Sequence, residues 1–467
     1  MKRSIFSLLA MVVLASACHK DSMDDKRPAA YYANTFAFNT MNTYYLWKDE
    51  PEVASELQDW TIKEEPIEKV TKTRYKADRW TRLYDDTSSF ETLVTGSGKT
   101  FGLEYKPYYY DEEKTRVIAV VLFTYAGSPA CNAGLKRGDG ILTVNGEIMT
   151  PDNYGRILNQ LYTETSLEME LADGRTVRMD AIEMYENPVH TVSLIEYNGV
   201  RYGYLHFSNF TLDACKDLET AFAQLKAVGI QELVLDLRYN TGGYAFTSMA
   251  LASMMAPPEV VSGKKVFNRD IYNDIISGEE KAETYFTPEC TYTSNITKEK
   301  VTVKPLDVNP GIRHLWVLVT GSSASASEAL ICGLKPYMDV TVVGGTTSGK
   351  FCGGNFIKAT DWYTAVEKDN GLKNIDYDDA RQSLSTWGIY VITSRYADCN
   401  GVTLSMPDGI PADISGEDVP YDGYELGDPR ESLLSSALGA VKSVPEAPYF
   451  VPVEQTGYRS KFSVLLH

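Results

Sequence analysis

A run of small and hydroxyl-bearing residues in the second half of the chain has the composition of a catalytic turn. Residues 321–328 read Gly-Ser-Ser-Ala-Ser-Ala-Ser-Glu and follow an apolar segment that predicts a strand. If a helix begins within this run, a serine hydroxyl lies at the helix N-terminus, where free N–H groups and the positive end of the helix dipole favour a developing oxyanion. This geometry suits a nucleophilic serine. The alternative is a structural N-cap, which is the commoner role of a serine at a helix start.

Two glycine-containing turns follow other predicted strands. Residues 344–350 read Gly-Gly-Thr-Thr-Ser-Gly-Lys, and residues 236–243 read Asp-Leu-Arg-Tyr-Asn-Thr-Gly-Gly. The first of these turns ends at Lys350. A serine hydroxyl is a weak nucleophile until a base takes its proton, and a neutral amine is one group that can do so. A phosphate-binding lysine is the alternative, but the full P-loop spacing is missing. We expect Asp236 and Arg238 to fix the second turn by hydrogen bonds.

Together the three segments resemble the C-terminal processing peptidases, which carry a PDZ domain before a Ser-Lys catalytic core. The resemblance spans roughly residues 90–440. It implies that Ser325 is the nucleophile and Lys350 the general base. It also implies an oxyanion hole made by the backbone N–H of Ala326 and one N–H from the turn Gly242-Gly243. The glycines have an alternative role, which is to allow a turn with positive φ.

The resemblance is incomplete next to the lysine. Family members often have a Gln or Glu four residues after the lysine that orients its amine, whereas this chain has Gly354. Asn355, or a residue from elsewhere in the chain, would have to take that role. Related tricorn-type peptidases pair the serine with a histidine, for which His206, next to Ser208, is the candidate here.

An earlier part of the chain resembles a PDZ domain. Residues 128–146 contain the stretch Ala-Gly-Leu-Lys-Arg-Gly-Asp-Gly-Ile-Leu-Thr-Val-Asn-Gly, in which a helical turn leads into a strand and a tight Asn-Gly turn. The resemblance implies that Gly102 and Leu103 belong to the loop whose N–H groups hold the carboxylate of a peptide C-terminus, while the peptide adds to the sheet as a strand. The alternative is a small β module that only packs against its neighbours.

The order of predicted elements gives the fold class. Strands are expected at 116–122, 166–171, 176–179, 202–207, 233–238, 315–319, 340–343 and 387–393, and helices at 152–162, 213–228 and 430–441. Strands that alternate with helices after residue 201 predict crossover connections. We therefore expect a multidomain α/β (α+β) protein whose core resembles crotonase-like and ClpP-like folds. The predicted parts are a helical N-terminal domain (31–92), a PDZ-like domain (93–185), an α/β peptidase core (186–445) with an irregular lid-like insert (257–310), and a tail (446–467).

The N-terminal residues predict export and lipid anchoring. Lys2 and Arg3 precede a largely apolar run from Ile5 to Ala17, which is shorter than the roughly 20 residues that span a bilayer. The small residues before Cys18 resemble a lipobox, which implies acylation of Cys18 after cleavage. We expect residues 1–17 to be a signal peptide and 18–30 a tether, with the protein anchored in a bacterial cell envelope, at the outer membrane. An ordinary export signal with a coincidental cysteine is the alternative.

Composition excludes several other classes of protein. The chain of 467 residues has 45 Lys+Arg against 63 Asp+Glu, so its net charge of -18 repels phosphate backbones and argues against a nucleic-acid partner. The six cysteines besides Cys18 lack metal-site spacing, so we expect no metal, no cofactor and mostly free thiols, with Cys332 and Cys352 as the pair nearest the motifs. Ser262 to Lys265 matches S-x-x-K by chance, without companion motifs.

These observations predict a serine endopeptidase. It would cleave proteins or peptides near free C-termini through an acyl-enzyme, with the PDZ-like domain holding the substrate C-terminus. Contact with a membrane would come through the lipid anchor only. The alternative is a peptide-binding surface lipoprotein that kept the fold and lost catalysis. Hydrolysis of another acyl substrate on the same core is a third possibility.

Overall fold

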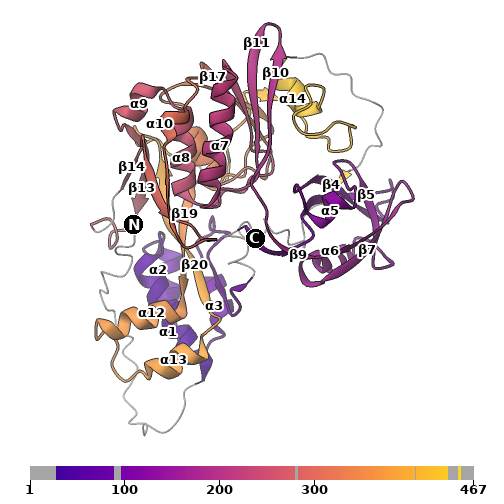
Figure 1. Ribbon diagram of the computed structural model, residues 1–467. Helices are drawn as coiled ribbons and strands as arrows, with labels where there is room; N and C mark the ends of the chain where they lie inside the picture. The colour runs from indigo at the N-terminus through magenta and orange to yellow at the C-terminus, as the bar shows by residue number, and fades with distance from the viewer. Residues whose placement is uncertain (1–27, 89–95, 279–281, 405, 440–450, 454–467) are drawn as a thin grey trace.

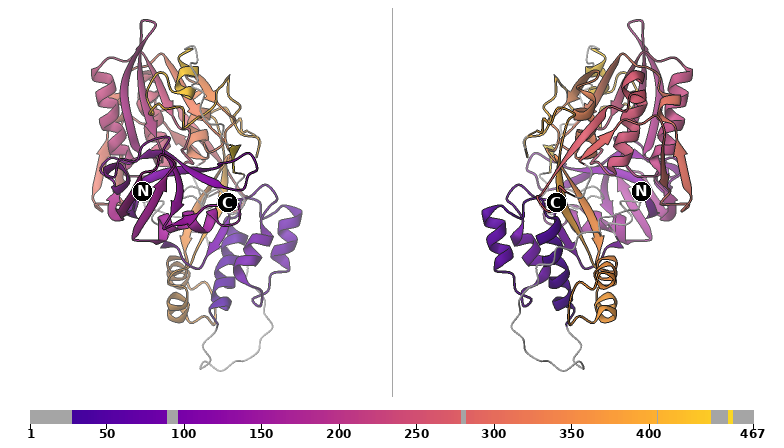
Figure 2. Two further views of the ribbon diagram at one scale, coloured as in Figure 1. Left: turned by 90° about the vertical axis from the view of Figure 1, so that its right-hand side faces the viewer. Right: turned by 90° about the vertical axis from the view of Figure 1, so that its left-hand side faces the viewer.

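The computed structural model describes residues 28–88, 96–278, 282–404, 406–439 and 451–453. Figures 1 and 2 show three lobes: an α/β core, a lobe of helices and a smaller β domain. Cys18 and the predicted signal peptide lie outside the described residues. Within the described ranges, no helix is long and apolar enough to cross a membrane.

A six-stranded sheet forms the centre of the α/β core. Its order is β10-β11-β12-β17-β18-β21, and all neighbours from β11 onward are parallel, while β10 and β11 form an antiparallel hairpin. The strands are β10 (Val189–Tyr197), β11 (Val200–Phe207), β12 (Glu232–Asp236), β17 (His314–Val319), β18 (Asp339–Gly344) and β21 (Ile414–Ser415). The predicted strands of this region are confirmed.

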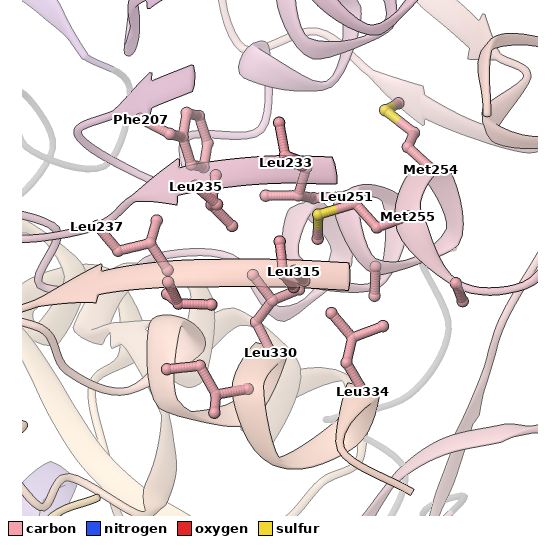
Figure 3. Close-up of a cluster of buried hydrophobic side chains, with 14 of the residues drawn as sticks. Phe207, Leu233, Leu235, Leu237, Leu251, Met254, Met255, Leu315, Leu330 and Leu334 are labelled. Atoms are coloured by element: carbon pink, nitrogen blue, oxygen red, sulfur yellow. The ribbon is translucent and has the colours of Figure 1, made fainter. Parts of the chain in front are cut away.

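Helices cover both faces of this sheet, which explains why its strands are nearly continuous apolar runs. On one face, Leu233, Leu235 and Leu315 pack with Leu330 and Leu251 (Figure 3). The helices on this side are α7 (Ala214–Ala227), α8 (Ala245–Met255), α9 (Pro258–Ser262), α10 (Pro305–Val308) and α11 (Ala326–Leu334). The other face packs against α14 (Ser432–Ala437), which is shorter than the helix predicted at 430–441.

The parallel arrangement brings the three sequence motifs to one edge of the sheet. The turn at 237–243 follows β12, the serine run follows β17, and the turn ending at Lys350 follows β18. Because β12, β17 and β18 are adjacent and parallel, their carboxyl ends lie side by side. This edge is where open α/β sheets carry their ligand sites.

A second sheet lies beyond this edge. It has the order β1-β20-β13-β14, with β19 paired to β20, and its strands are β1 (Arg82–Tyr84), β13 (Val266–Tyr272), β14 (Glu283–Tyr285), β19 (Cys352–Lys358) and β20 (Gly388–Ala397). The expectation of an irregular insert at 257–310 is therefore wrong. The insert supplies β13 and β14 to this sheet and also forms the hairpin of β15 (Cys290–Thr293) and β16 (Lys300–Val303). Its strands are short and partly exposed, so their sequence resembles a polar loop.

The N-terminal helices do not form a domain with a core of their own, which corrects the predicted boundary at 31–92. One cluster of buried side chains joins Phe36 and Tyr45 to Trp362, Tyr363 and Ile389. The helices of this lobe are α1 (Ala29–Tyr44), α2 (Pro51–Gln58), α3 (Pro66–Thr73), α12 (Ala359–Lys368) and α13 (Tyr377–Ser383) (Figure 1). The helical lobe therefore folds together with the second sheet.

The β domain contains a sheet of order β22-β3-β4-β5-β7-β8, with β6 paired to β5, and a separate pair of β2 and β9. Its elements are β2 (Ser97–Thr100), β3 (Leu103–Tyr109), β4 (Val117–Thr124), α5 (Pro129–Asn132), β5 (Gly140–Val144), β6 (Glu147–Ile148), α6 (Tyr154–Thr163), β7 (Ser166–Leu171), β8 (Thr176–Asp180) and β9 (Ile182–Tyr185). The predicted strands, helix and Asn145-Gly146 turn are confirmed. Strands β2, β3 and β9 were not predicted, and neither was β22 (Val451–Pro452), which comes from the predicted tail and joins this sheet.

A buried ionic network fixes the β domain to the α/β core. The Arg137 side chain donates to the Tyr239 hydroxyl at 2.7 Å and to Asp418 at 2.8 Å. Arg238 donates to Asp418 at 3.0 Å and forms a two-pronged contact with Glu431 at 2.6 and 3.0 Å. Burial alone would raise the pKa of Asp418, but the two guanidinium groups hold this pKa well below its usual range. The interaction stabilises the fold above the ordinary carboxyl pKa and is lost as the pH falls below it.

The replacement Arg137→Met tests whether this network holds the two parts together. It leaves Asp418 and Glu431 buried with one cation fewer, and removing one partner of a buried ion pair costs about 3 kcal/mol. We expect a loss of this size in the free energy of urea unfolding at pH 7. Arg156→Met removes an exposed arginine of the same domain and should leave the unfolding midpoint unchanged. Equal midpoints for both variants would contradict the role of the network.

Candidate active site

The turn after β17 holds Ser325 in a strained backbone conformation. Ser325 is the N-cap of α11, with φ 55° and ψ -112°. A serine at positive φ costs of order 1–3 kcal/mol, and such strain persists only where surrounding contacts over-determine it. A sharp strand-to-helix turn of this kind projects the side chain away from the sheet edge.

The structure distinguishes the four serines of this run. The Ser323 hydroxyl donates to the Leu237 carbonyl at 2.8 Å, and the Ser327 hydroxyl donates to the Asn240 carbonyl at 3.0 Å, so both are structural and buried. Ser322 is exposed on the turn. Ser325 is half-buried and combines partial access with the strained N-cap position. Among these four hydroxyls, that of Ser325 has the geometry of a nucleophile.

The Glu328 carboxylate joins the serine turn to the lysine turn. One oxygen accepts the backbone N–H of Ser325 and that of Lys350, each at 2.9 Å. The other accepts the Thr347 hydroxyl at 2.5 Å and the Gly349 N–H at 2.7 Å. Glu328 is fully buried, and burial raises the pKa of its carboxyl, while these four hydrogen bonds oppose the rise. Two turns from different parts of the chain therefore share one buried acceptor.

Lys350 lies in a buried aromatic setting. Its side chain is 2% exposed, and the Nζ lies 5.6 Å from the centre of the Trp80 ring and 5.2 Å from that of the Tyr390 ring. Within the described residues, no hydrogen bond joins the Lys350 amine directly to the Ser325 hydroxyl. The Tyr396 hydroxyl lies 2.8 Å from the Ser325 carbonyl and also contacts the Lys350 carbonyl, so the two backbones are linked a second time.

Tyr390 occupies the place of the missing orienting side chain. A Cβ at Gly354 would lie 2.7 Å from the Tyr390 ring and 2.9 Å from its hydroxyl oxygen. That hydroxyl accepts a 3.4 Å hydrogen bond from the Lys350 amine. Asn355 donates instead to the Thr393 hydroxyl at 3.0 Å, which makes its predicted substitution for the orienting group wrong. Glycine at 354 thus leaves room for a tyrosine that arrives from β20.

The predicted oxyanion donors lie next to Ser325. A Cβ at Gly242 would lie 2.8 Å from the Ser325 Cβ and 3.0 Å from the Ala326 nitrogen, so only glycine, here at φ 106°, permits this approach. The Gly242 N–H donates to the Asn240 side chain at 2.9 Å and is therefore already engaged. The N–H groups of Ala326 and Gly243 have no hydrogen-bond acceptor among the described residues. These two, rather than Gly242, have the free donors that an oxyanion hole requires.

Two further predictions concern this edge of the sheet: the pair Asp236 and Arg238, and His206. Asp236 accepts the backbone N–H of Arg238 at 3.1 Å and its side chain at 3.0 Å, so the predicted role of this pair in fixing the turn is confirmed. His206 packs against Phe123 and Tyr239, and neither ring nitrogen has a hydrogen-bond partner within the described residues. The Ser208 hydroxyl donates to the Pro188 carbonyl. Among the described residues His206 therefore has no hydrogen bond to Ser325 or to Ser208, and no contact supports the Ser-His alternative.

In the loop predicted to hold a peptide carboxylate, one of the two predicted residues already uses its N–H group in a hydrogen bond within the protein. Gly102 has φ 71°, and a Cβ there would lie 2.2 Å from the Ser128 Cβ, so this position requires glycine. Its N–H donates to the Thr100 hydroxyl at 3.0 Å and does not point freely into the loop, which counts against Gly102 as a carboxylate donor. Leu103 begins β3 and pairs with Thr124.

The described residues contain neither a candidate metal site nor a disulfide. No group of three or more His, Cys, Asp or Glu residues among them could hold a metal ion. The six cysteines from Cys131 to Cys399 are free, as predicted. The residues that sequence reasoning missed are Trp80, Tyr390 and Tyr396. No local signal identifies them, because they reach the lysine turn from distant parts of the chain.

Comparison with known proteins relates the α/β core to a family of peptidases. Residues 201–415 match the model of peptidase family S41. A probable CtpA-like serine protease of Staphylococcus aureus (strain N315) is 25% identical over 290 residues, which cover 60% of this chain and 52% of that protein. The carboxy-terminal processing protease CtpA of Bacillus subtilis (strain 168) is 27% identical over 271 residues, 57% of this chain and 50% of that protein. The chain spans about half the length of the curated relatives it matches.

A solved structure shows the same fold. The S41-type protein of Bacteroides fragilis superposes with a TM-score of 0.64 at 20% identity, covering 86% of this chain and 96% of that one. The prediction of a mixed α/β multidomain architecture is thereby confirmed. The α/β core is therefore similar to peptidase family S41 over residues 201–415, and the fold is shared with an S41-type protein over most of the chain.

Proposed function

We propose that this protein is a serine endopeptidase that uses Ser325 as nucleophile and Lys350 as general base. The observation that carries the proposal is the Glu328 carboxylate, which ties the strained backbone of Ser325 and the backbone of Lys350 to one buried acceptor. The contact between Glu328 and the Ser325 N–H is also half of a capping box at the start of α11, but a structural N-cap needs neither positive φ nor a link to a buried lysine. The similarity to CtpA-type proteases supports the same reaction class.

The reaction follows acyl-enzyme chemistry. The Ser325 oxygen attacks the scissile carbonyl carbon while its proton passes to the neutral Lys350 amine. The negative charge on the carbonyl oxygen meets the free N–H groups of Ala326 and Gly243. The C–N bond then breaks, and the leaving amine takes the proton from Lys350. Water next attacks the ester carbonyl while Lys350 takes its proton, and the bond between the Ser325 oxygen and the carbonyl carbon breaks as the serine oxygen takes that proton back. Catalytic hydrogen bonds are often long before substrate binds, so a resting site without a direct serine–lysine contact is compatible with this route.

Tyr390 is the proposed positioning group for the lysine. Burial raises the pKa of Tyr390, so its hydroxyl keeps its proton and can donate to a neutral Lys350 amine or accept from a charged one. This would supply what a Gln or Glu side chain four residues after the lysine supplies in the family pattern. Tyr390 acts through Lys350 and does not touch the substrate.

The substrates and location are part of the same proposal. We propose that the β domain is PDZ-like and binds protein or peptide C-termini by strand addition, so that cleavage falls near those ends. We further propose that the chain is exported and anchored through a lipid on Cys18 at the bacterial outer membrane. A peptide-binding lipoprotein without catalysis is the competing function. The observation that favours it is that no hydrogen bond among the described residues joins the Lys350 amine to the Ser325 hydroxyl.

Replacing Ser325 or Lys350 tests the dyad. Casein and peptides with apolar C-termini should be cleaved by the wild type, and turnover should fall by at least about 10³-fold in Ser325→Ala and in Lys350→Ala, because both groups act in one step. Ser322→Ala, in the same turn, should keep wild-type turnover. Circular dichroism checks folding. A folded wild type that binds peptides but cleaves none would establish the competing function.

Tyr390→Phe tests the positioning role. Loss of the hydroxyl frees the Lys350 amine to rotate, so kcat should fall by roughly 10-fold or more with KM unchanged, and the pH midpoint of kcat should move. Tyr337→Phe removes a comparable hydroxyl, which donates to the Val266 carbonyl away from the lysine, and should change neither quantity. A pH profile identical to that of wild type would assign Tyr390 a structural role only.

Glu328→Gln tests the shared acceptor at nearly constant volume. The amide can accept at one oxygen only, and its NH₂ group would face two N–H donors or the Thr347 hydroxyl. Leaving buried donors unpaired costs about 1–3 kcal/mol, so both the free energy of unfolding and kcat should fall. Glu259→Gln, on the exposed helix α9, is the control. Wild-type kcat in folded Glu328→Gln would remove Glu328 from the account.

A further inference from the structure

A short segment from the C-terminal part of the chain lies along the edge of the β domain. Strand β22 pairs antiparallel with β3, with Val451 opposite Tyr109 and Pro452 opposite Tyr108. The Val453 N–H continues the ladder by donating to the Pro107 carbonyl at 3.2 Å. The other edge of β3 pairs with β4 along its whole length. The segment therefore occupies the one edge of β3 that a further strand can reach.

The side chains of this segment alternate as in a bound peptide. Val453 is 7% exposed and belongs to the hydrophobic cluster of the β domain, with Leu103 and Tyr105 of β3 and with Ile157 of α6. The adjacent Pro452 is exposed. Helix α6 runs beside β3, because the Tyr105 hydroxyl lies 3.5 Å from the Leu158 carbonyl. Val453 thus lies where a strand and a helix present apolar side chains together.

The direction of the segment also matches strand addition. An antiparallel register carries β22 from Tyr109 toward the start of β3, where the loop at Gly102 lies. A peptide that adds to this sheet with its C-terminal end at that loop runs in the same direction on the same edge. The segment and such a peptide cannot occupy the edge together.

We propose that residues 451–453 are an intramolecular occupant of the peptide-binding edge of the β domain and that a substrate peptide must displace them. This inference rests on the proposed peptide binding by the β domain. It names the favoured ligand as an extended peptide with an apolar side chain at the position of Val453. Residues 438–450 join the segment to α14, so tethering gives it a high effective concentration at this edge.

The contact has the properties of a displaceable strand. It is short, and Pro107 removes one N–H donor from the ladder. A longer substrate strand would form more main-chain hydrogen bonds along β3 than the segment does. The segment therefore weakens the apparent affinity of the edge for a substrate peptide, but a peptide that binds more strongly can still displace it.

Peptide binding to the full chain tests this inference. The probe is a fluorescein-labelled peptide with the sequence of residues 448–457, and all proteins carry Ser325→Ala so that the probe is not cleaved. Val453→Asp places a charge in the apolar cluster and should release the segment, so the probe should bind at least about threefold more tightly than to the parent. Ile148→Asp adds the same charge at an exposed apolar position of the same domain, on β6 and outside the segment, and should leave binding unchanged.

A milder variant keeps the test independent of folding. Val453→Ala removes contact area without adding charge and should also tighten binding of the probe, though less. Equal or weaker binding in folded Val453→Asp and Val453→Ala would overturn the inference. Casein turnover, measured with Ser325 intact, reports separately on the proposed function: tighter probe binding without turnover leaves the inference standing and removes the peptidase.

Discussion

The site depends on one buried carboxylate. Glu328 accepts hydrogen bonds from the backbones of Ser325, Gly349 and Lys350, which belong to the turns after β17 and β18. An ionised carboxylate in a buried place is costly unless its oxygens are satisfied, and four donors satisfy it here. The same contacts hold Ser325 at its positive φ, because a strained residue persists only where its neighbours leave it no alternative. Removing the acceptor would release both turns together.

Each of the three lobes contributes residues at or next to the carboxyl edge of the central sheet. The helical lobe supplies Trp80 against the Lys350 amine, and β20 of the second sheet supplies Tyr390 and Tyr396. The β domain is joined to the core through Arg137, whose partner Tyr239 lies on the same turn that carries Gly243. Buried contacts therefore connect the β domain to the turn that carries Gly243, and the helical lobe and second sheet to Lys350.

Sequence alone predicts much of this arrangement. Buried parallel strands such as β12 and β17 can be recognised in the sequence as short apolar runs. Three motifs that each follow such a strand predict a shared site at the carboxyl edge of the sheet. The contacts of Lys350 cannot be predicted from the sequence, because Trp80 and Tyr390 approach it only after the helical lobe and β20 pack together. The same applies to β22, a strand so short that composition carries no signal of it. The engaged Gly242 N–H depends on an Asn240 rotamer that spacing cannot predict.

The most direct test of the central claim is labelling with a serine-reactive fluorophosphonate, followed by mass spectrometric mapping of the modified residue. The account predicts a single adduct on Ser325 in the wild type, with labelling that rises with pH and is lost in Lys350→Ala, because only the lysine can take the serine proton. An adduct on a different serine, or labelling of Ser325 that does not change when Lys350 is replaced, would contradict it.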